Sequence, residues 1–263
     1  MLAIEHLQKT YNTGGKSLEV LRDVTFTVNE GEFVTVVGPS GAGKTTLLRC
    51  MAGLLAPSGG SVTLTNSGKV IDSPPQEIAC VFQDYSRSLM PWYKVGRNVG
   101  LPLANTIKDK SKRQEAVEQA LHSVGLDGFA DSYPWQLSGG MQQRVAIARA
   151  LAYRPDFLIM DEPFASVDAQ TRADLEDLIL RIRQTAGVTI VLVTHDIDEA
   201  VYLADRVVVV SSRPTVVMDV IDVDLPRPRS QVTTKGLPRF GELRTQVATL
   251  ITRAGAEAAA RND

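Results

Sequence analysis

Hydrophobic and polar positions change their period along the chain, and these changes predict alternating strands and helices. Near the N-terminus Val20, Val24, Phe26 and Val28 alternate with polar residues, which is typical of half-buried strands. The continuous apolar run at 33–37 instead indicates a strand buried on both faces. Further strands are expected at 61–65, 78–82, 157–160, 188–193 and 206–211.

Helical spacing of apolar residues fills most of the intervals between these runs. One helix is expected after the first buried run, from Leu47, Leu48, Met51, Leu54 and Leu55. Another is expected around 175–182, whereas residues from about 86 to 154 lack strand runs and indicate an inserted helical lobe. The segment from Pro226 predicts an irregular linker followed by a C-terminal helix. Strands that alternate with helices predict an α/β fold with a doubly wound sheet.

Bulk composition is ordinary for a globular domain, with 263 residues, 44% of them hydrophobic and 22% charged. A net charge of −2 weighs against nucleic acid as the main partner. No apolar run approaches the ~18–20 residues that span a bilayer, and the N-terminus lacks a secretory signal, so we expect a cytoplasmic protein. Cys50 and Cys80 are expected to be free thiols, although one disulfide is possible; neither has zinc-ligand spacing.

The strongest chemical signal is a glycine-rich segment between the first buried strand and its helix. It reads Gly38-Pro39-Ser40-Gly41-Ala42-Gly43-Lys44-Thr45, and it matches the phosphate-binding loop pattern in full. Glycines let consecutive backbone N–H groups curl around phosphate oxygens, and the helix N-terminus adds partial positive charge. Lys44 is expected to reach the β- and γ-phosphates, and the Thr45 hydroxyl to bind Mg²⁺. A chance glycine-rich turn is the alternative.

Two acids follow the predicted strand at 157–160. Because ligands bind at the carboxyl ends of strands in open α/β sheets, Asp161 is expected to hold Mg²⁺, directly or through water. Glu162 is placed to polarise the attacking water. A solvated acidic turn is the alternative, and the phosphate-loop pattern upstream weighs against it.

A second helix start has the composition of an anion site. Leu137-Ser138-Gly139-Gly140-Met141-Gln142-Gln143-Arg144 offers a hydroxyl and two glycines at a helix N-terminus. This octapeptide resembles the signature of ABC-type ATPases at every position; a capped helix with a Gly-Gly turn is the alternative. The resemblance covers roughly 2–215. It implies a P-loop NTPase (RecA-like) sheet core with an N-terminal antiparallel β portion and an inserted helical lobe.

The sequence pattern sets the expected domain limits, and the resemblance implies a dimer. The ATPase domain spans 1–225, with a sheet core at about 1–85 and 155–215 and the helical lobe at about 86–154; 226–263 form a C-terminal tail. In this family two chains pack head to tail as a homodimer across two ATP. Each nucleotide then lies between the phosphate loop of one chain and the signature of the other, an isologous arrangement.

The family's functional residues transfer to matching positions here. For nucleotide contact the resemblance implies Tyr11, Gly38, Pro39, Ser40, Gly41, Ala42, Gly43, Lys44, Thr45 and Thr46, with Ser138, Gly139, Gly140, Gln142 and Asp168 acting across the dimer. For Mg²⁺ it implies Thr45, Gln83 and Asp161, and for catalysis Glu162, His195 and Gln83.

Three of these assignments depend on weaker patterns. Gln83, which closes a predicted strand, has an exposed polar strand end as its alternative. Tyr11, placed after a predicted first strand, resembles the aromatic that stacks on adenine, but it is also compatible with a core tyrosine. His195 resembles the switch histidine of the γ-phosphate. Before Asp168 the chain has Val167 where the family usually has leucine, which is a mild departure.

Finer patterns resemble importers of the nitrate, sulfonate and taurine group. They are Leu89-Met90-Pro91-Trp92 with Asn98-Val99, Ser212-Arg213-Pro214, and Asp224-Leu225-Pro226-Arg227-Pro228-Arg229. The resemblance implies an integral-membrane permease, an extracytoplasmic solute-binding protein as an indirect partner, and a peripheral position on the cytoplasmic face of the inner membrane.

It also implies a permease groove around 87–98, although Trp92 and Tyr93 are compatible with a core role. A soluble ABC ATPase that acts on nucleic acid or ribosomes, and an inactive scaffold, are the rival functions. Intact Lys44, Asp161 and Glu162 weigh against a scaffold.

Overall fold

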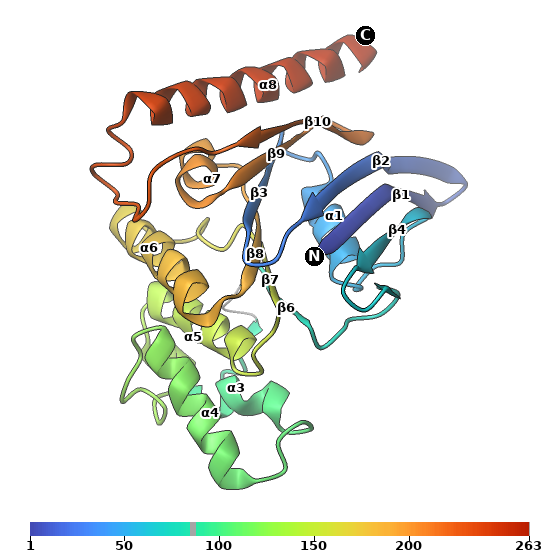
Figure 1. Ribbon diagram of the computed structural model, residues 1–263. Helices are drawn as coiled ribbons and strands as arrows, with labels where there is room; N and C mark the ends of the chain where they lie inside the picture. The colour runs from blue at the N-terminus through green and yellow to red at the C-terminus, as the bar shows by residue number, and fades with distance from the viewer. Residues whose placement is uncertain (85–87, 263) are drawn as a thin grey trace. The chain divides into compact units, whose positions relative to one another are not determined.

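The computed structural model describes residues 1–84 and 88–262, and its chain divides into two compact units. Unit 1 comprises 1–75 and 189–263, and unit 2 comprises 76–188. Figure 1 shows the ribbon coloured along the sequence. Within the described residues, no helix is both long and apolar enough to cross a bilayer.

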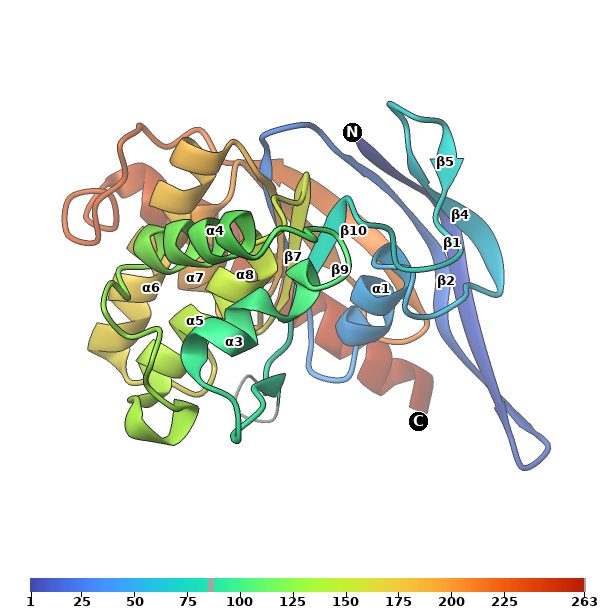
Figure 2. The ribbon, with the colours of Figure 1, turned by 90° about the horizontal axis from the view of Figure 1, so that it is seen from below.

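Unit 1 is built on one sheet that joins antiparallel and parallel strands. Its strands, in sheet order, are β5 (Lys69–Val70), β4 (Gly59–Leu64), β1 (Leu2–Thr13), β2 (Lys16–Val28), β10 (Thr215–Asp222), β9 (Arg206–Val210), β3 (Phe33–Val37) and β8 (Thr189–Val193). β1 and β2 form the long hairpin seen in Figure 2, and β1 also pairs antiparallel with β4. β3 lies between β8 and β9, parallel to both. The N-terminal antiparallel portion expected from the sequence is therefore present.

The expected helix after β3 is shorter than its apolar pattern indicated. α1 (Lys44–Met51) ends before Leu54 and Leu55, so the prediction that both lie on this helix was wrong. The N–H groups of Leu54 and Leu55 both donate to the Arg49 carbonyl, at 2.9 and 3.2 Å, and Gly53 has a left-handed backbone. Glycine just beyond the last turn is a common helix stop, and here it overrides the apolar spacing.

The C-terminal part of unit 1 contains a strand that the sequence pattern did not indicate. β10 pairs with β2 on one side and β9 on the other, so it joins the two parts of the sheet. Many residues of β10 are half-buried, so buried and exposed positions do not alternate regularly along the strand as they do in a typical half-buried strand. The expected C-terminal helix is α8 (Pro238–Asn262), which packs on α7 (Ile197–Leu203), β9 and β10.

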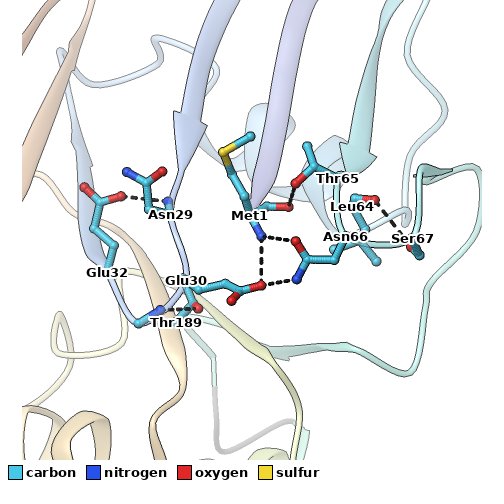
Figure 3. A network of polar contacts seen from close by, with 10 residues as sticks. Met1, Asn29, Glu30, Glu32, Leu64, Thr65, Asn66, Ser67 and Thr189 are labelled. Carbon is cyan, nitrogen blue, oxygen red and sulfur yellow. Dashed lines mark hydrogen bonds and ion pairs between the residues drawn. The ribbon is translucent and has the colours of Figure 1, made fainter.

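A polar network ties the N-terminal residue to neighbouring turns of unit 1 (Figure 3). The Met1 carbonyl accepts from the Thr65 backbone N–H and hydroxyl, both at 3.0 Å. The Met1 amino group lies 3.4 Å from Glu30 Oε1 and 3.3 Å from Asn66 Oδ1. These contacts fasten the start of β1 to the turns that follow β4 and β2.

Unit 2 combines a parallel strand pair with the expected helical segment. Its elements are β6 (Ile78–Val81), α3 (Val95–Gly100), the 3-10 turn η1 (Leu101–Leu103), α4 (Lys110–Ser123), the 3-10 turn η2 (Pro134–Gln136), α5 (Gly139–Leu151), β7 (Phe157–Asp161) and α6 (Ala169–Ala186). α3, α4 and α5 pack on one another, and α5 also contacts β6 and α6. Every residue of β7 is buried, as its apolar run predicted.

Candidate active site

The phosphate-loop sequence lies between β3 and α1, as predicted. Gly43 occupies the N-cap position of α1 with φ of 93°, and a Cβ there would lie 2.6 Å from Val20 Cγ1. A side chain is therefore excluded both by backbone conformation and by space. Gly43 has no side chain with which to cap this helix start, and the first N–H groups of a helix have no acceptors within the helix itself.

Lys44 and Thr215 hold the loop in shape from within unit 1. The buried Lys44 ammonium donates to the carbonyls of Gly38 at 2.8 Å and Pro39 at 3.0 Å. The Thr215 hydroxyl donates to the Ala42 carbonyl, and its side chain is fully buried. Thr215 escaped sequence reasoning because β10, which carries it, had no recognisable period.

Tyr11 lies inside β1, so its expected place after the first strand was wrong; the strand continues to Thr13. Its register partner in β2 is Leu18. The Tyr11 hydroxyl is 3.5 Å from Thr46 Oγ1 in the first turn of α1, and Lys9 Nζ lies 5.3 Å from its ring centroid. The half-buried tyrosine is thus beside the phosphate-loop helix rather than within the core.

His195 reaches the same sheet edge as the phosphate loop. β3 and β8 are parallel, with Val36 opposite Val193, and the Thr194 N–H donates to the Val36 carbonyl at 3.2 Å. Gly38 lies two residues after Val36, and His195 lies two residues after Val193. The loop and the exposed histidine therefore emerge side by side at the carboxyl ends of neighbouring strands.

Unit 2 repeats this arrangement with an acid and an amide. β6 and β7 are parallel, with Val81 opposite Met160. Gln83 and Glu162 follow two residues later, and Gln83 Nε2 lies 3.5 Å from Glu162 Oε2. Asp161 ends β7 and is buried. Glu162 has φ of 44°, a conformation that costs a non-glycine residue about 1–3 kcal/mol and is concentrated at functional sites.

The signature sequence forms the start of α5. Ser138 is its N-cap, and its Oγ accepts from the Met141 N–H at 3.3 Å. The Gln142 amide donates to the Leu137 carbonyl at 3.2 Å. Gly140 is buried, and a Cβ there would meet Thr171 Cγ2 at 2.4 Å. The second glycine of the pair therefore allows α5 to approach α6 closely.

Thr171 also binds the residue predicted to act across the dimer. Asp168 is the N-cap of α6 and accepts from the Thr171 N–H at 3.0 Å and the Thr171 hydroxyl at 2.7 Å. Both bonds stabilise the ionised carboxylate and so lower the pKa of Asp168. The bond from the Thr171 backbone N–H has the larger effect. Thr171 thus joins the start of α6 to the signature, a link that residue spacing did not reveal.

The segment predicted to face a permease is ordered around Asn98. The fully buried Asn98 amide donates to the Met90 and Tyr93 carbonyls, at 3.1 and 3.0 Å, and its Oδ1 accepts from the Met90 N–H at 2.8 Å. Trp92 is 67% exposed, so the core alternative for this residue is wrong. Tyr93 is half-buried, with the Arg97 guanidinium 3.7 Å from its ring centroid. Arg87 lies outside the described residues.

A cavity of about 390 Å³ follows this segment within unit 2. It is lined by Cys80, Leu101, Pro102, Arg149, Ala150 and Tyr153. Arg149 donates to the Ser88 carbonyl at 2.6 Å and to its hydroxyl at 2.8 Å. Burial lowers the pKa of Arg149 and raises that of Tyr153 to about 12, so the Tyr153 phenol keeps its proton at neutral pH.

Comparison with known proteins agrees with this architecture. A family model described as ABC transporter matches residues 21–165. An uncharacterised ABC transporter ATP-binding protein of Methanocaldococcus jannaschii is 45% identical over 95% of this chain and 91% of its own length. The aliphatic sulfonates import ATP-binding protein SsuB of Bacillus cereus is 39% identical over 97% of both chains.

Two further comparisons differ in coverage. The nitrate import ATP-binding protein NrtC of Synechococcus elongatus is 41% identical over 95% of this chain, which spans only 38% of that relative's length. A solved dimeric ATP-binding cassette in a post-hydrolysis state with ADP and Pi has a TM-score of 0.74 and 32% identity, covering 85% of this chain and 99% of the other. The matched motifs, the fold and these relatives together show that the chain belongs to the ABC transporter family, as one of its ATP-binding, ATP-hydrolysing subunits.

Proposed function

We propose that two copies of this chain form a head-to-tail dimer that hydrolyses two ATP and drives solute import through a separate permease. The observation that carries the proposal is that two helices each begin with a glycine that no larger residue could replace without a clash. These glycines are Gly43 at the start of α1 in unit 1 and Gly140 in the first turn of α5 in unit 2. One chain thus offers two anion-binding helix ends for one kind of ligand. The dimeric cassette among the solved structures supports the pairing.

In this proposal the α1 start binds the phosphates, and Lys44 turns from the loop carbonyls toward the β- and γ-phosphates. Tyr11 stacks on adenine, a contact of about 1–3 kcal/mol. Ser138, Gly139, Gly140 and Gln142 contact the ATP held by the other copy. Asp168 supports that surface through Thr171.

Hydrolysis is assigned to the acid–amide pair of unit 2 and to the histidine of unit 1. Glu162 accepts the proton of the attacking water, and Gln83, 3.5 Å from it, orients that water. His195 donates to the γ-phosphate. Because Thr45, Gln83 and Asp161 supply oxygen donors, they suit a hard cation, and Mg²⁺ would be held there to neutralise phosphate charge.

Import, rather than work on nucleic acid, is supported by the relatives named for nitrate and sulfonate import. The net charge of −2 agrees, because nucleic-acid-binding domains are usually basic. We infer a small solute of the nitrate, sulfonate or taurine kind, received through an extracytoplasmic binding protein. The chain then sits peripherally on the cytoplasmic face of the membrane, with the permease on Trp92 and the cavity beside Arg149.

A matched pair of tryptophans tests the permease surface. Trp92 and Trp135 are 67% and 69% exposed, so replacing either with serine has a similar small effect on the fold. Affinity purification of the tagged chain from detergent-solubilised membranes should recover a polytopic permease with wild type and with Trp135→Ser. Trp92→Ser should reduce that recovery about tenfold, the cost of removing a central aromatic contact. Recovery of only soluble partners or nucleic acid by the wild-type chain would contradict the importer proposal.

A further inference from the structure

The helix that follows His195 is short and is held at both ends. α7 has seven residues, and an isolated helix of that length is unstable, so its position depends on tertiary contacts. At its start Asp196 caps the N–H groups of Asp198 and Glu199, at 2.9 and 3.1 Å. The buried Thr194 hydroxyl donates to Glu199 Oε2 at 2.6 Å.

These bonds tie the backbone on both sides of His195 to α7. Thr194 precedes the histidine and bonds to Glu199, whereas Asp196 follows it and caps the helix. The Asp196 N–H in turn donates to the Thr194 hydroxyl at 3.0 Å. A displacement of α7 along its axis therefore moves the histidine with it.

The other end of α7 is held by an arginine from the C-terminal segment. Arg229 Nη1 donates to the Tyr202 carbonyl, and Nη2 donates to the Ala204 carbonyl at 2.6 Å. Nη1 also lies 3.5 Å from the Val201 carbonyl. The last carbonyls of a helix lack partners within it and carry partial negative charge, so a planar cation is well suited to hold them.

Neighbouring contacts fix the segment that carries Arg229. Arg227 pairs with Asp205, whose other carboxylate oxygen accepts from the Phe33 N–H at 3.0 Å. Lys235 Nζ lies 4.7 Å from the ring centroid of Tyr202, which is fully buried in α7. Arg244 of α8 also pairs with Asp198 at 2.6 Å, but both side chains are largely exposed and solvent screens that pair. Arg229 is thus the stronger hold on α7.

We propose that Arg229 is a positioning residue for ATP hydrolysis: by holding the C-terminal carbonyls of α7, it fixes the distance from His195 to the γ-phosphate. The inference rests on the proposed role of His195. The inference makes ATP turnover depend on the segment that carries Arg229, which lies outside residues 21–165, the part of the chain that the family model matches. Arg229 touches neither nucleotide nor water in this scheme and acts through the helix.

The test combines steady-state kinetics with a double-mutant cycle on the full chain. Arg229→Gln should lower kcat about tenfold, because a misplacement of about 1 Å is enough for such losses, while KM for ATP stays within about twofold. Arg229→Lys, which keeps one cationic donor, should recover part of kcat. Arg239→Gln is the matched control, since Arg239 belongs to the same C-terminal segment but pairs with the exposed Asp224.

The cycle separates positioning from simple stabilisation. In a His195→Ala background, Arg229→Gln should cause no further loss of kcat, because no histidine remains to be positioned. If Arg229→Gln lowers kcat equally in the wild-type and His195→Ala backgrounds, the inference about Arg229 is wrong. It is also wrong if Arg229→Gln lowers the melting temperature but leaves kcat unchanged. Neither result would contradict the proposed function. If His195→Ala keeps full turnover, the proposed role of His195 fails and the inference falls with it. Should Arg229→Gln not fold, Arg229→Lys is carried through the same cycle.

Discussion

The helix at the phosphate loop and the helices near the signature begin in opposite ways. The N-cap of α1 is Gly43, which has no side chain to accept a bond, whereas α5 and α6 are capped by the side chains of Ser138 and Asp168. An uncapped start gives its N–H groups to a ligand whenever one is present. A serine cap accepts one N–H bond and still has its own hydrogen to donate to phosphate. An ionised aspartate has no such hydrogen, so Asp168 orders α6 by accepting hydrogen bonds and cannot itself donate to phosphate.

In the proposed function a single chain binds ATP through unit 1, and unit 2 contributes water activation and the contact across the dimer. The largest effect on turnover is expected from a substitution at Glu162, which changes water activation and leaves ATP binding unchanged. Glu162→Gln removes the base and leaves both helix starts intact, so turnover should fall by about 10²–10⁴. ATP binding should persist, and an ATP-dependent dimer should accumulate in light scattering. Unaltered turnover would exclude Glu162 as the base.

Ser138→Arg is expected to have the next largest effect. The substitution blocks the α5 start, so turnover should fall about 100-fold, while nucleotide binding by single chains remains. Mixing this variant with Lys44→Ala chains should restore part of the activity. In a mixed dimer, the intact phosphate loop of the Ser138→Arg chain faces the intact signature of the Lys44→Ala chain, so one of the two sites is complete. If mixing restores nothing, loop and signature act within one chain, and the head-to-tail arrangement is wrong.

Sequence reasoning was most successful where a backbone pattern and a chemical requirement coincide. The buried strands β3, β7 and β8 were expected within a residue of their observed bounds, because uninterrupted apolar runs identify them. The residues after those strands could then be placed at the sheet edge, since parallel strands bring their carboxyl ends together. Glu162 and Gln83 were named separately, and the β6–β7 register brings them within 3.5 Å.

The missed residues are those that act through long-range packing. Thr215 supports the phosphate loop from a strand without a clear period, and Thr171 supports the signature from a helix on a separate stretch of chain. Arg229 lies in a segment that local pattern predicted only as a linker. Tertiary contacts of this kind leave no periodic signal, and neither a hydroxyl nor a guanidinium is distinctive by type.

Gly140→Ala tests the close approach of α5 and α6, with a smaller expected effect. The added Cβ would meet Thr171 Cγ2 at 2.4 Å, so overpacking should cost about 1–3 kcal/mol of unfolding free energy and lower turnover about tenfold. Adding Thr171→Ser removes that methyl but keeps the hydroxyl that binds Asp168, and it should restore most of both quantities. Urea unfolding and ATPase rates measure the pair. Thr171→Ser by itself should resemble wild type; a failure to rescue would place the strain elsewhere.

The smallest effect is expected at the two thiols, one in each unit. Burial raises the pKa of Cys50 to about 11 and that of Cys80 to about 12. Unfolded thiols titrate near 8.5, so between that pH and the folded pKa the unfolded chain has lost protons that the folded chain keeps. Stability from these thiols is therefore complete below about pH 8.5 and declines above it, by about 1 kcal/mol per thiol between pH 8 and 9.5.

Urea unfolding of wild type and of the Cys50→Ala, Cys80→Ala double variant over this pH range measures the difference. The double variant should lose less stability as pH rises, although its absolute stability is lower because one buried and one half-buried side chain are truncated. Alkylation provides an independent check: at pH 8 both native thiols should react at least about 100-fold more slowly than a free thiol, because so little thiolate is present. Fast reaction of Cys80 in the native protein would show that the cavity beside Arg149 admits water to that thiol, and that its pKa is lower than burial predicts.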